Sequence, residues 1–130
     1  MPKSFLLIGA ILGALSVILG AFAAHSLKKI VPPESITTFE TGVRYQFYHT
    51  FALLAVGILL ERFQSQSLIW AGYLFVAGII LFSGSLYLLA ILKSTENVGL
   101  SKIGIITPIG GLLFVAGWIM LFIGILKRNG

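Results

Sequence analysis

Long runs of apolar residues without a single charge alternate with short polar segments along the chain. Three of these runs are long, covering residues 4–24, 68–92 and 103–126. A transmembrane α-helix needs about 20 predominantly apolar residues to cross a hydrocarbon core of about 30 Å. The pattern therefore predicts a membrane-spanning helix over each of the three ranges.

A fourth apolar run, residues 51–60, is interrupted by Glu61 and Arg62. It is too short to span a bilayer, so its helix must begin earlier, within residues 42–50. We therefore predict a fourth span over about residues 43–61, and an even number of spans places both termini on one side of the membrane. Three spans with a re-entrant or interfacial segment are the alternative.

The connection between the first two spans contains the sequence Pro32-Pro33-Glu34. Proline in a first turn, followed by a carboxylate near the positive end of the helix dipole, is typical of a helix start. A capping box formed by Thr37 and Glu40 is an alternative start. Either start predicts a short amphipathic helix at the membrane surface that leads into the second span. Glu40 and Arg44 have the i, i+4 spacing of an intrahelical ion pair.

The other connections are short, which favours antiparallel neighbouring helices. The sequence thus predicts an all-α fold, an integral membrane four-helix up-down bundle with a short interfacial amphipathic helix between spans 1 and 2. Residues 1–130 are expected to form a single transmembrane domain.

The composition excludes several other classes of protein. Hydrophobic residues make up 58% of the chain and charged residues 10%, whereas soluble domains have roughly 45–50% and 25%. The Lys and Arg residues are scattered between apolar runs, while a nucleic-acid-binding face requires them in one patch. The absence of cysteine from the sequence excludes disulfides and cysteine-ligated metals.

Basic residues lie on both sides of the predicted bundle in nearly equal number. The termini side has Lys3, Arg62, Lys127 and Arg128, and the other side has Lys28, Lys29, Arg44, Lys93 and Lys102. Arg44 falls inside a predicted helix, and the α-amine adds a charge to the termini side. By the positive-inside rule we expect cytoplasmic termini.

Small residues form stripes on the first and last predicted helices. Such stripes allow close helix packing in lipid. They pack either against helices of the same chain or against another subunit, which leaves a homo-oligomer open. The predicted packing glycines are Gly9, Gly13, Gly20, Gly110, Gly117 and Gly124.

Polar residues of all four predicted spans fall in the half of the membrane remote from the termini. Counting along the helices places His25 at that surface and His49 about 12 Å below it, with their side chains converging. Polar side chains at membrane depth mark functional sites by default. The candidate ligand-binding residues are His25, Arg44, Tyr45, Gln46, His49, Ser83, Ser85, Tyr87 and Thr107.

Each of these residues also has a structural interpretation. His49 could hydrogen-bond Tyr45 or Ser83, and His25 could cap a helix C-terminus. Arg44 could pair with Glu40 or reach the headgroups. The tyrosines and tryptophans, Trp118 among them, include residues of the aromatic belts at the membrane interfaces.

Four sequence blocks together resemble a known family. They are Gly20-Ala-Phe-Ala-Ala-His25, Tyr45-Gln-Phe-Tyr-His49, Leu81-Phe-Ser-Gly-Ser-Leu-Tyr87 and Thr107-Pro-Ile-Gly-Gly111, followed by Gly117-Trp118. The chain is similar to domain of unknown function 423, the UPF0382 inner-membrane proteins, which have transmembrane protein 256 as an animal relative. One departure is Ala23, where the family commonly has glycine. The resemblance implies a four-helix protein of the bacterial cytoplasmic membrane and supplies no activity.

The hypothesis we favour is a non-enzymatic bundle whose polar pocket, near one membrane face, binds a lipid headgroup, a small polar ligand or a partner protein. Arg44 with the two imidazoles would suit a phosphate or carboxylate. The alternatives are a small-solute or ion transporter that uses His49, and a metal or haem site formed by His25 and His49. Catalysis by Ser83 or Ser85 with His49 lacks a carboxylate at that depth. We therefore predict no catalytic residue, no metal site and no cofactor.

Overall fold

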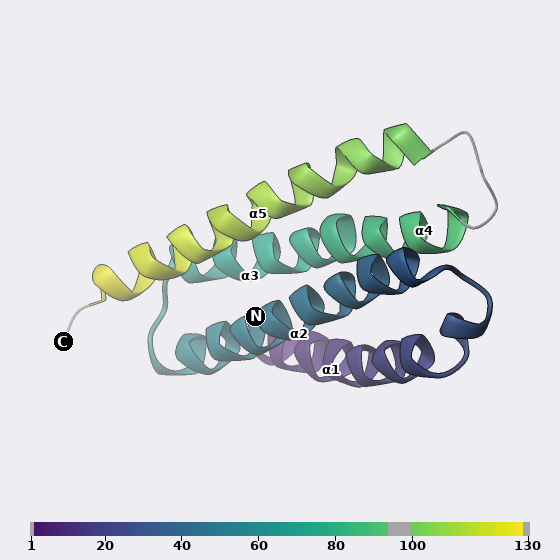
Figure 1. Cartoon of the computed structure of the whole chain (residues 1–130). Coiled ribbons are helices and arrows are strands. Elements are labelled where there is room, and N and C mark those ends of the chain that lie inside the picture. The colour runs from purple at the N-terminus through teal and green to yellow at the C-terminus, as the bar shows by residue number, and fades with distance from the viewer. Residues whose placement is uncertain (1, 94–99, 129–130) are drawn as a thin grey trace.

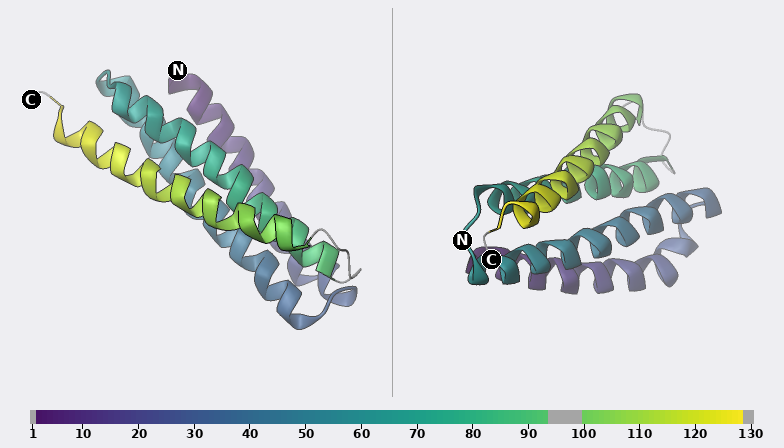
Figure 2. Two further views of the ribbon diagram at one scale, coloured as in Figure 1. Left: turned by 90° about the horizontal axis from the view of Figure 1, so that it is seen from above. Right: turned by 90° about the vertical axis from the view of Figure 1, so that its left-hand side faces the viewer.

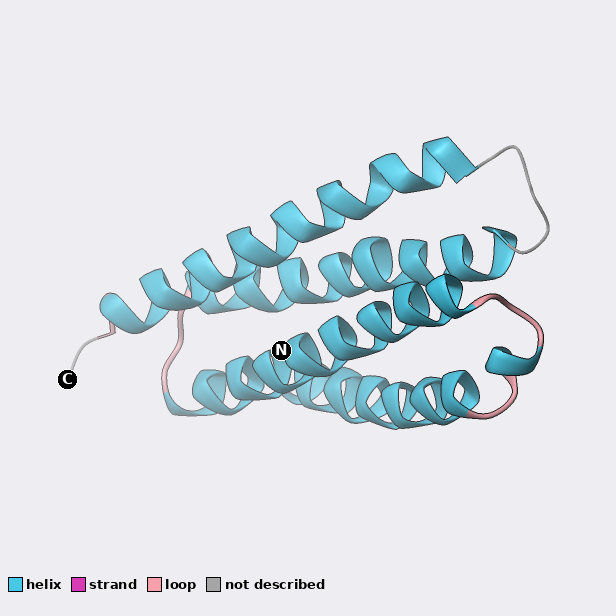
Figure 3. Cartoon of the chain, viewed as in Figure 1, coloured by secondary structure: helices cyan, strands magenta, loops and turns pink. Residues whose placement is uncertain are grey.

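The computed structural model describes residues 2–93 and 100–128, and within these ranges it contains helices and no strand. Figure 1 and Figure 3 show long helices that run antiparallel to their neighbours. The helices are α1 (Pro2–Ala24), α2 (Pro33–Arg62), α3 (Gln66–Gly78), α4 (Gly84–Lys93) and α5 (Leu100–Leu126). A 3₁₀ turn (Leu27–Lys29) follows α1, and a π-helical turn (Ile79–Ser83) joins α3 to α4.

Four stretches are long and apolar enough to cross a membrane. They are Lys3–Lys29, Pro33–Arg62, Gln66–Leu92 and Lys102–Leu126, the third of which comprises α3, the π turn and α4. The predicted all-α fold with four spans is confirmed. Both termini lie at the same end of the bundle (Figure 2).

α2 begins at Pro33, directly after Pro32 in an extended conformation, as the proline pattern indicates. The amphipathic segment expected at the membrane surface is not a separate helix but the first turns of α2, since this helix continues for 30 residues. Within it, the Thr37 hydroxyl donates to the Pro33 carbonyl at 3.3 Å, so Thr37 does not cap a helix start. Arg44 Nη2 donates to Thr41 Oγ1 at 3.2 Å and not to Glu40 as expected.

The spans are arranged as a row in which each packs on the next (Figure 1, Figure 2). α1 packs on α2, α2 packs on α3 and α4, and α5 packs on α3, the π turn and α4. The most apolar window is therefore 50% buried in α2 but only 17% in α1 and 22% in α5. The two outer helices turn most of their surface towards lipid.

Contacts at two glycines of α1 show which residues of α1 and α2 lie at the same height along the bundle. A Cβ atom added to Gly13 would lie 3.7 Å from Thr50 Cγ2, and one added to Gly20 would lie 3.6 Å from Val43 Cγ1. Because the helices are antiparallel, this register places His49 level with Ala14, near the middle of α1.

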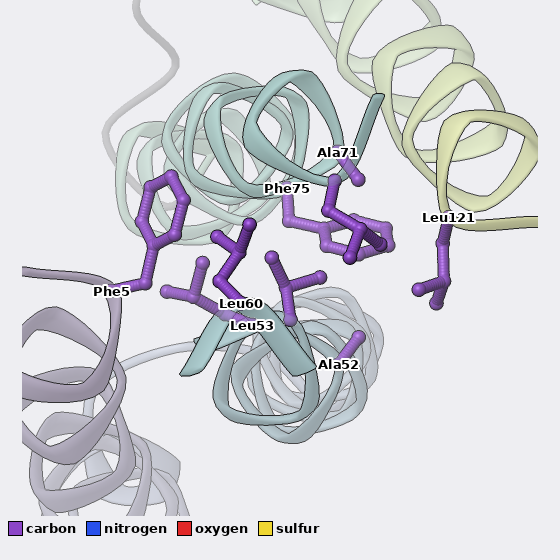
Figure 4. Packing of buried hydrophobic residues seen from close by; sticks show 9 residues of the cluster. Phe5, Ala52, Leu53, Leu60, Ala71, Phe75 and Leu121 are labelled. Carbon is purple, nitrogen blue, oxygen red and sulfur yellow. The ribbon is translucent and has the colours of Figure 1, made fainter. Parts of the chain in front are cut away.

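An apolar cluster fills the end of the bundle that carries the termini. Its side chains come from α1, α2, α3 and α5 and point towards one another (Figure 4). Glycines lie opposite some of the larger side chains, with Gly72 against Phe5 and Gly117 against Phe75. The buried members are Phe5, Ala52, Leu53, Val56, Leu60, Leu68, Ala71, Phe75 and Leu121.

The π turn brings its backbone against α5. A Cβ atom added to Gly110 would lie 2.7 Å from the Phe82 Cα atom. A π turn inserted in an α-helix is uncommon and is frequently found at functional sites. Here it places the Phe82 side chain between α2 and α5.

Candidate functional site

A groove of about 410 Å³ lies between α2 and α5. We call it the aromatic groove, because five of its lining side chains are Tyr, Phe or Trp. It is lined by Tyr45, Tyr48 and His49 from α2, Phe82 from the π turn, and Gly111, Phe114, Val115 and Trp118 from α5.

His49 is buried at the wall of this groove, and both of its ring nitrogens are hydrogen-bonded. The Trp118 indole N–H donates to Nε2 at 3.0 Å. Because an indole nitrogen only donates, Nε2 must be unprotonated, and the ring proton is on Nδ1. Nδ1 lies 2.7 Å from the Tyr45 carbonyl oxygen, to which it donates. The imidazole is therefore held as one neutral tautomer.

Three rings beside the groove are nearly parallel. The His49 and Phe114 ring centroids are 3.5 Å apart with an interplanar angle of 8°. The Tyr45 ring is inclined by 15° to His49 and by 21° to Phe114. Trp118 meets His49 edge-on. These contacts fix the orientation of the aromatic faces along the groove.

Tyr45 and Tyr48 carry hydroxyl groups that have no hydrogen-bond partner within residues 2–93 and 100–128. Their side chains are 37% and 52% exposed. By the α1–α2 register, Tyr48 is level with Leu15, well inside the membrane-spanning part of α1. Both tyrosines thus belong to the part of α2 that is long and apolar enough to span a membrane, and their side chains are open at the groove.

Two other polar residues predicted for the site, Gln46 and Tyr87, are paired inside the bundle. The Tyr87 hydroxyl donates to Gln46 Oε1 at 2.6 Å, and Gln46 Nε2 donates to the Leu12 carbonyl at 3.1 Å. This chain of contacts, which we call the Gln46 network, links α4, α2 and α1. Gln46 is 3% exposed, so the network is a structural connection between helices.

Ser83, the last residue of the π turn, and Ser85 in α4 are also paired. Ser83 Oγ donates to the Gly42 carbonyl at 2.6 Å, which ties the turn to α2. Ser85 Oγ lies 2.5 Å from Thr107 Oγ1, which ties α4 to α5. The structure thus brings these predicted residues together across helices, but places none of them in the lining of the aromatic groove.

His25 is exposed after the last turn of α1, with its backbone N–H bonded to the Ala21 carbonyl. In the α1–α2 register His49 is level with Ala14, so the two imidazoles are separated by about 16 Å along the helix axis. The prediction that they converge is therefore wrong. The described residues also contain no group of three or more metal-ligating side chains.

The sequence does not point to several residues of the groove. The sequence suggests an interface-belt aromatic at Trp118, but its indole bonds His49 within the bundle. The available signal was the spacing of Gly111, Phe114, Val115 and Trp118, because steps of three and four place residues on one helix face. The residues in question are Tyr48, Phe82, Gly111, Phe114, Val115 and Trp118.

The fold and the polar contacts between its spans define an integral membrane protein with four transmembrane helices. The family profile described as "Protein of unknown function (DUF423)" matches residues 19–111. The chain is 41% identical over 128 residues to a UPF0382 membrane protein of Staphylococcus aureus, covering 98% of this chain and 99% of that one. The chain therefore belongs to the UPF0382 (DUF423) family of membrane proteins.

Two further relatives have similar lengths. UPF0382 membrane protein YwdK of Bacillus subtilis is 40% identical over 126 residues, covering 96% of this chain and 98% of the relative. UPF0382 inner membrane protein YgdD of Escherichia coli strain K12 is 38% identical over 133 residues, covering 100% and 97%. No solved structure matches the chain.

Proposed function

We propose that the protein is a non-enzymatic membrane protein that binds a neutral, lipid-soluble molecule in the aromatic groove. The observation that carries the proposal is the pair of unpartnered hydroxyls, Tyr45 and Tyr48, which belong to the membrane-spanning part of α2 and are open at the groove. The ligand's polar group meets these hydroxyls, and its apolar body lies against the rings of the groove.

The cost of an unpaired hydroxyl in hydrocarbon supports a partner from outside the chain. A hydroxyl moved from water into an alkane without a hydrogen bond costs roughly 4–8 kcal/mol, and acyl chains offer no acceptor. The chain pairs Tyr87, Ser83 and Ser85 internally. The hydroxyls of Thr50 and Ser35 also lack a partner, but both side chains are enclosed between helices, whereas Tyr45 and Tyr48 are open at the groove. The groove volume of about 410 Å³ is within the range of small-molecule pockets.

The lining of the groove indicates a ligand without charge. None of its eight lining residues is Lys, Arg, Asp or Glu. An ion at membrane depth without a counter-charge is strongly disfavoured. Arg44, which suggested a phosphate or carboxylate at the sequence level, is exposed and contacts Thr41 instead. A neutral ligand therefore replaces the charged one in this proposal.

The cellular location belongs to the same proposal. The Escherichia coli relative is named an inner membrane protein. We place this chain in the bacterial cytoplasmic membrane with cytoplasmic termini, since the basic residues near the membrane ends slightly favour that orientation. A ligand dissolved in the bilayer reaches the groove laterally, without crossing either surface.

Two glycines of α5 give a matched test. Gly111 lines the groove, and a Cβ atom added to it would lie 3.8 Å from Phe82 Cδ2, an ordinary contact, so Gly111→Leu places a side chain at the groove wall. A Cβ added to Gly104 meets nothing within 4 Å, so Gly104→Leu adds the same side chain outside the groove.

The experiment is organic extraction of the detergent-purified native chain and of both variants, followed by mass spectrometry of the released molecules. We expect a neutral compound to copurify with the native chain and Gly104→Leu and to be lost from Gly111→Leu. Equal amounts of every neutral compound in the three preparations, or none in any, would overturn the proposal.

A further inference from the structure

We infer that the ligand of the aromatic groove carries a planar conjugated ring with a carbonyl oxygen, the chemistry of an isoprenoid quinone headgroup. This inference rests on the proposed function and names the class of molecule that the groove would take. The choice of a quinone-like ring follows from three features of the groove: its parallel rings, its phenolic donors and the absence of charged residues from its lining.

The ring geometry favours a flat ligand. Tyr45, His49 and Phe114 form a nearly parallel set, with interplanar angles of 8° to 21°. A conjugated ring placed against this set extends it by stacking, which contributes beyond the area that is buried. A saturated ring system or an acyl chain would be stabilised by the burial of its apolar area alone, without the contribution from stacking. The groove thus discriminates by ring shape as well as by hydrophobicity.

The hydrogen-bonding groups favour a ligand that accepts. His49 Nε2 is already occupied by Trp118, and His49 Nδ1 by the Tyr45 carbonyl. The phenolic O–H groups of Tyr45 and Tyr48 are the side-chain donors that remain in the lining. A quinone is neutral and presents two carbonyl acceptors, so one molecule can accept from one or both tyrosines without bringing a charge into the membrane.

The chain provides its own optical reporter. It has two tryptophans, Trp118 in the groove and Trp70 on α3. The Trp70→Phe variant leaves Trp118 as the only tryptophan, and Trp118→Phe leaves Trp70 as a control for collisional quenching. The probe is menaquinone-4, titrated into nanodiscs of neutral phospholipid that contain the full-length chain.

We expect menaquinone-4 to quench Trp118 along a saturable curve and Trp70 along a non-saturating one. The double variant Tyr45→Phe/Tyr48→Phe, made on the Trp70→Phe background, should need about tenfold more quinone for half-saturation, because it removes two neutral hydrogen bonds. Tyr73→Phe, on α3 and outside the groove lining, should leave the half-saturation point unchanged. Gly111→Leu should abolish the saturable phase and Gly104→Leu should retain it.

Non-saturating quenching of Trp118, equal in all variants, would overturn the quinone assignment. So would a saturable curve that the double tyrosine variant leaves unchanged. The proposed function fails separately, because the extraction experiment asks only whether any neutral compound is lost from Gly111→Leu. A copurifying neutral compound together with non-saturating quinone quenching would leave the groove a binding site and refute this ligand class.

Discussion

In the half of the bundle that carries the termini, helices meet through aliphatic and aromatic side chains, with glycines such as Gly72 opposite the bulky Phe5 (Figure 4). In the opposite half, hydrogen bonds cross between helices, from Ser83 to α2, from Tyr87 to Gln46 and between Ser85 and Thr107. The aromatic groove lies where these two halves meet.

The two halves hold their helices together in lipid in different ways, one by close packing and the other by hydrogen bonds between helices. Lipid is as apolar as leucine, so helices associate through close packing and polar contacts rather than through the hydrophobic effect. Regular helices satisfy their own backbone, and packing alone suffices for them. The polar half contains the π turn and Pro108 inside α5, both of which disturb the regular helical hydrogen bonds. Hydrogen bonds between helices accompany this irregular backbone.

Gly110→Ala should have the largest effect, because the added Cβ would lie 2.7 Å from the Phe82 Cα, a backbone atom that cannot rotate away. We expect a loss of about 3 kcal/mol in the free energy of unfolding, measured by steric trapping in bicelles. Gly13→Ala is the matched control, since its Cβ finds ordinary contact at 3.7 Å from Thr50. Equal stability of the two variants would contradict the close approach of α5 to the π turn.

Gly72→Ala should have an intermediate effect in the apolar half. Its Cβ would meet the buried Phe5 ring, a side chain that can be shortened. We expect about 2 kcal/mol of destabilisation from overpacking, with much of it recovered in the double variant Gly72→Ala/Phe5→Leu. A double-mutant cycle measures this coupling, and an additive result would show that packing between these two residues is not what holds α1 against α3.

Tyr87→Phe should cost about 1 kcal/mol, because it removes a 2.6 Å hydrogen bond and leaves the Gln46 Oε1 atom unpaired in the polar half. Tyr48→Phe, which removes a phenolic oxygen without a partner in the described residues, supplies the comparison. The same unfolding assay applies. If Tyr87→Phe proves fully neutral, the Gln46 network does not contribute to the stability of the polar half.

Trp118→Phe should have the smallest effect on stability, about 0.6 kcal/mol, the average for a hydrogen bond between membrane helices. Its sharper readout is ¹⁵N NMR of the His49 imidazole. We expect the native spectrum to show a proton on Nδ1, with an Nε2 resonance that shifts when the indole donor is removed. A proton on Nε2 in the native chain would contradict the hydrogen bonding at the junction of the two halves.

The membrane spans could be predicted from the sequence, because a long apolar run without charges is stable in lipid only as a helix that crosses the membrane. The start of α2 at Pro33 was equally readable, since proline fixes its own backbone and tolerates the first turn. The relative heights of His25 and His49 along the bundle could not be predicted from the sequence. It depends on which residues of α2 face Gly13 and Gly20, and periodicity gives the face of a helix but not its register against a neighbour.

The site was predicted only in part, for two physical reasons. Gln46, Ser83 and Tyr87 were recognised as polar residues at depth, but a sequence does not show that such groups have one another or the backbone as partners. Trp118 has the composition of an interface anchor, and only its packing against His49 reveals another role. The π turn carries no local sequence signal that we recognise.

The depth of the tyrosine pair is the most direct test of the central claim, that open hydroxyls lie inside the membrane without a partner from the chain. The sequence contains no cysteine, so Tyr48→Cys and Lys28→Cys each give a single thiol. With a membrane-impermeant maleimide added to both sides of lipid vesicles, we predict rapid labelling of Lys28→Cys and no labelling of Tyr48→Cys. Equally rapid labelling of the two would place Tyr48 in water and contradict the account.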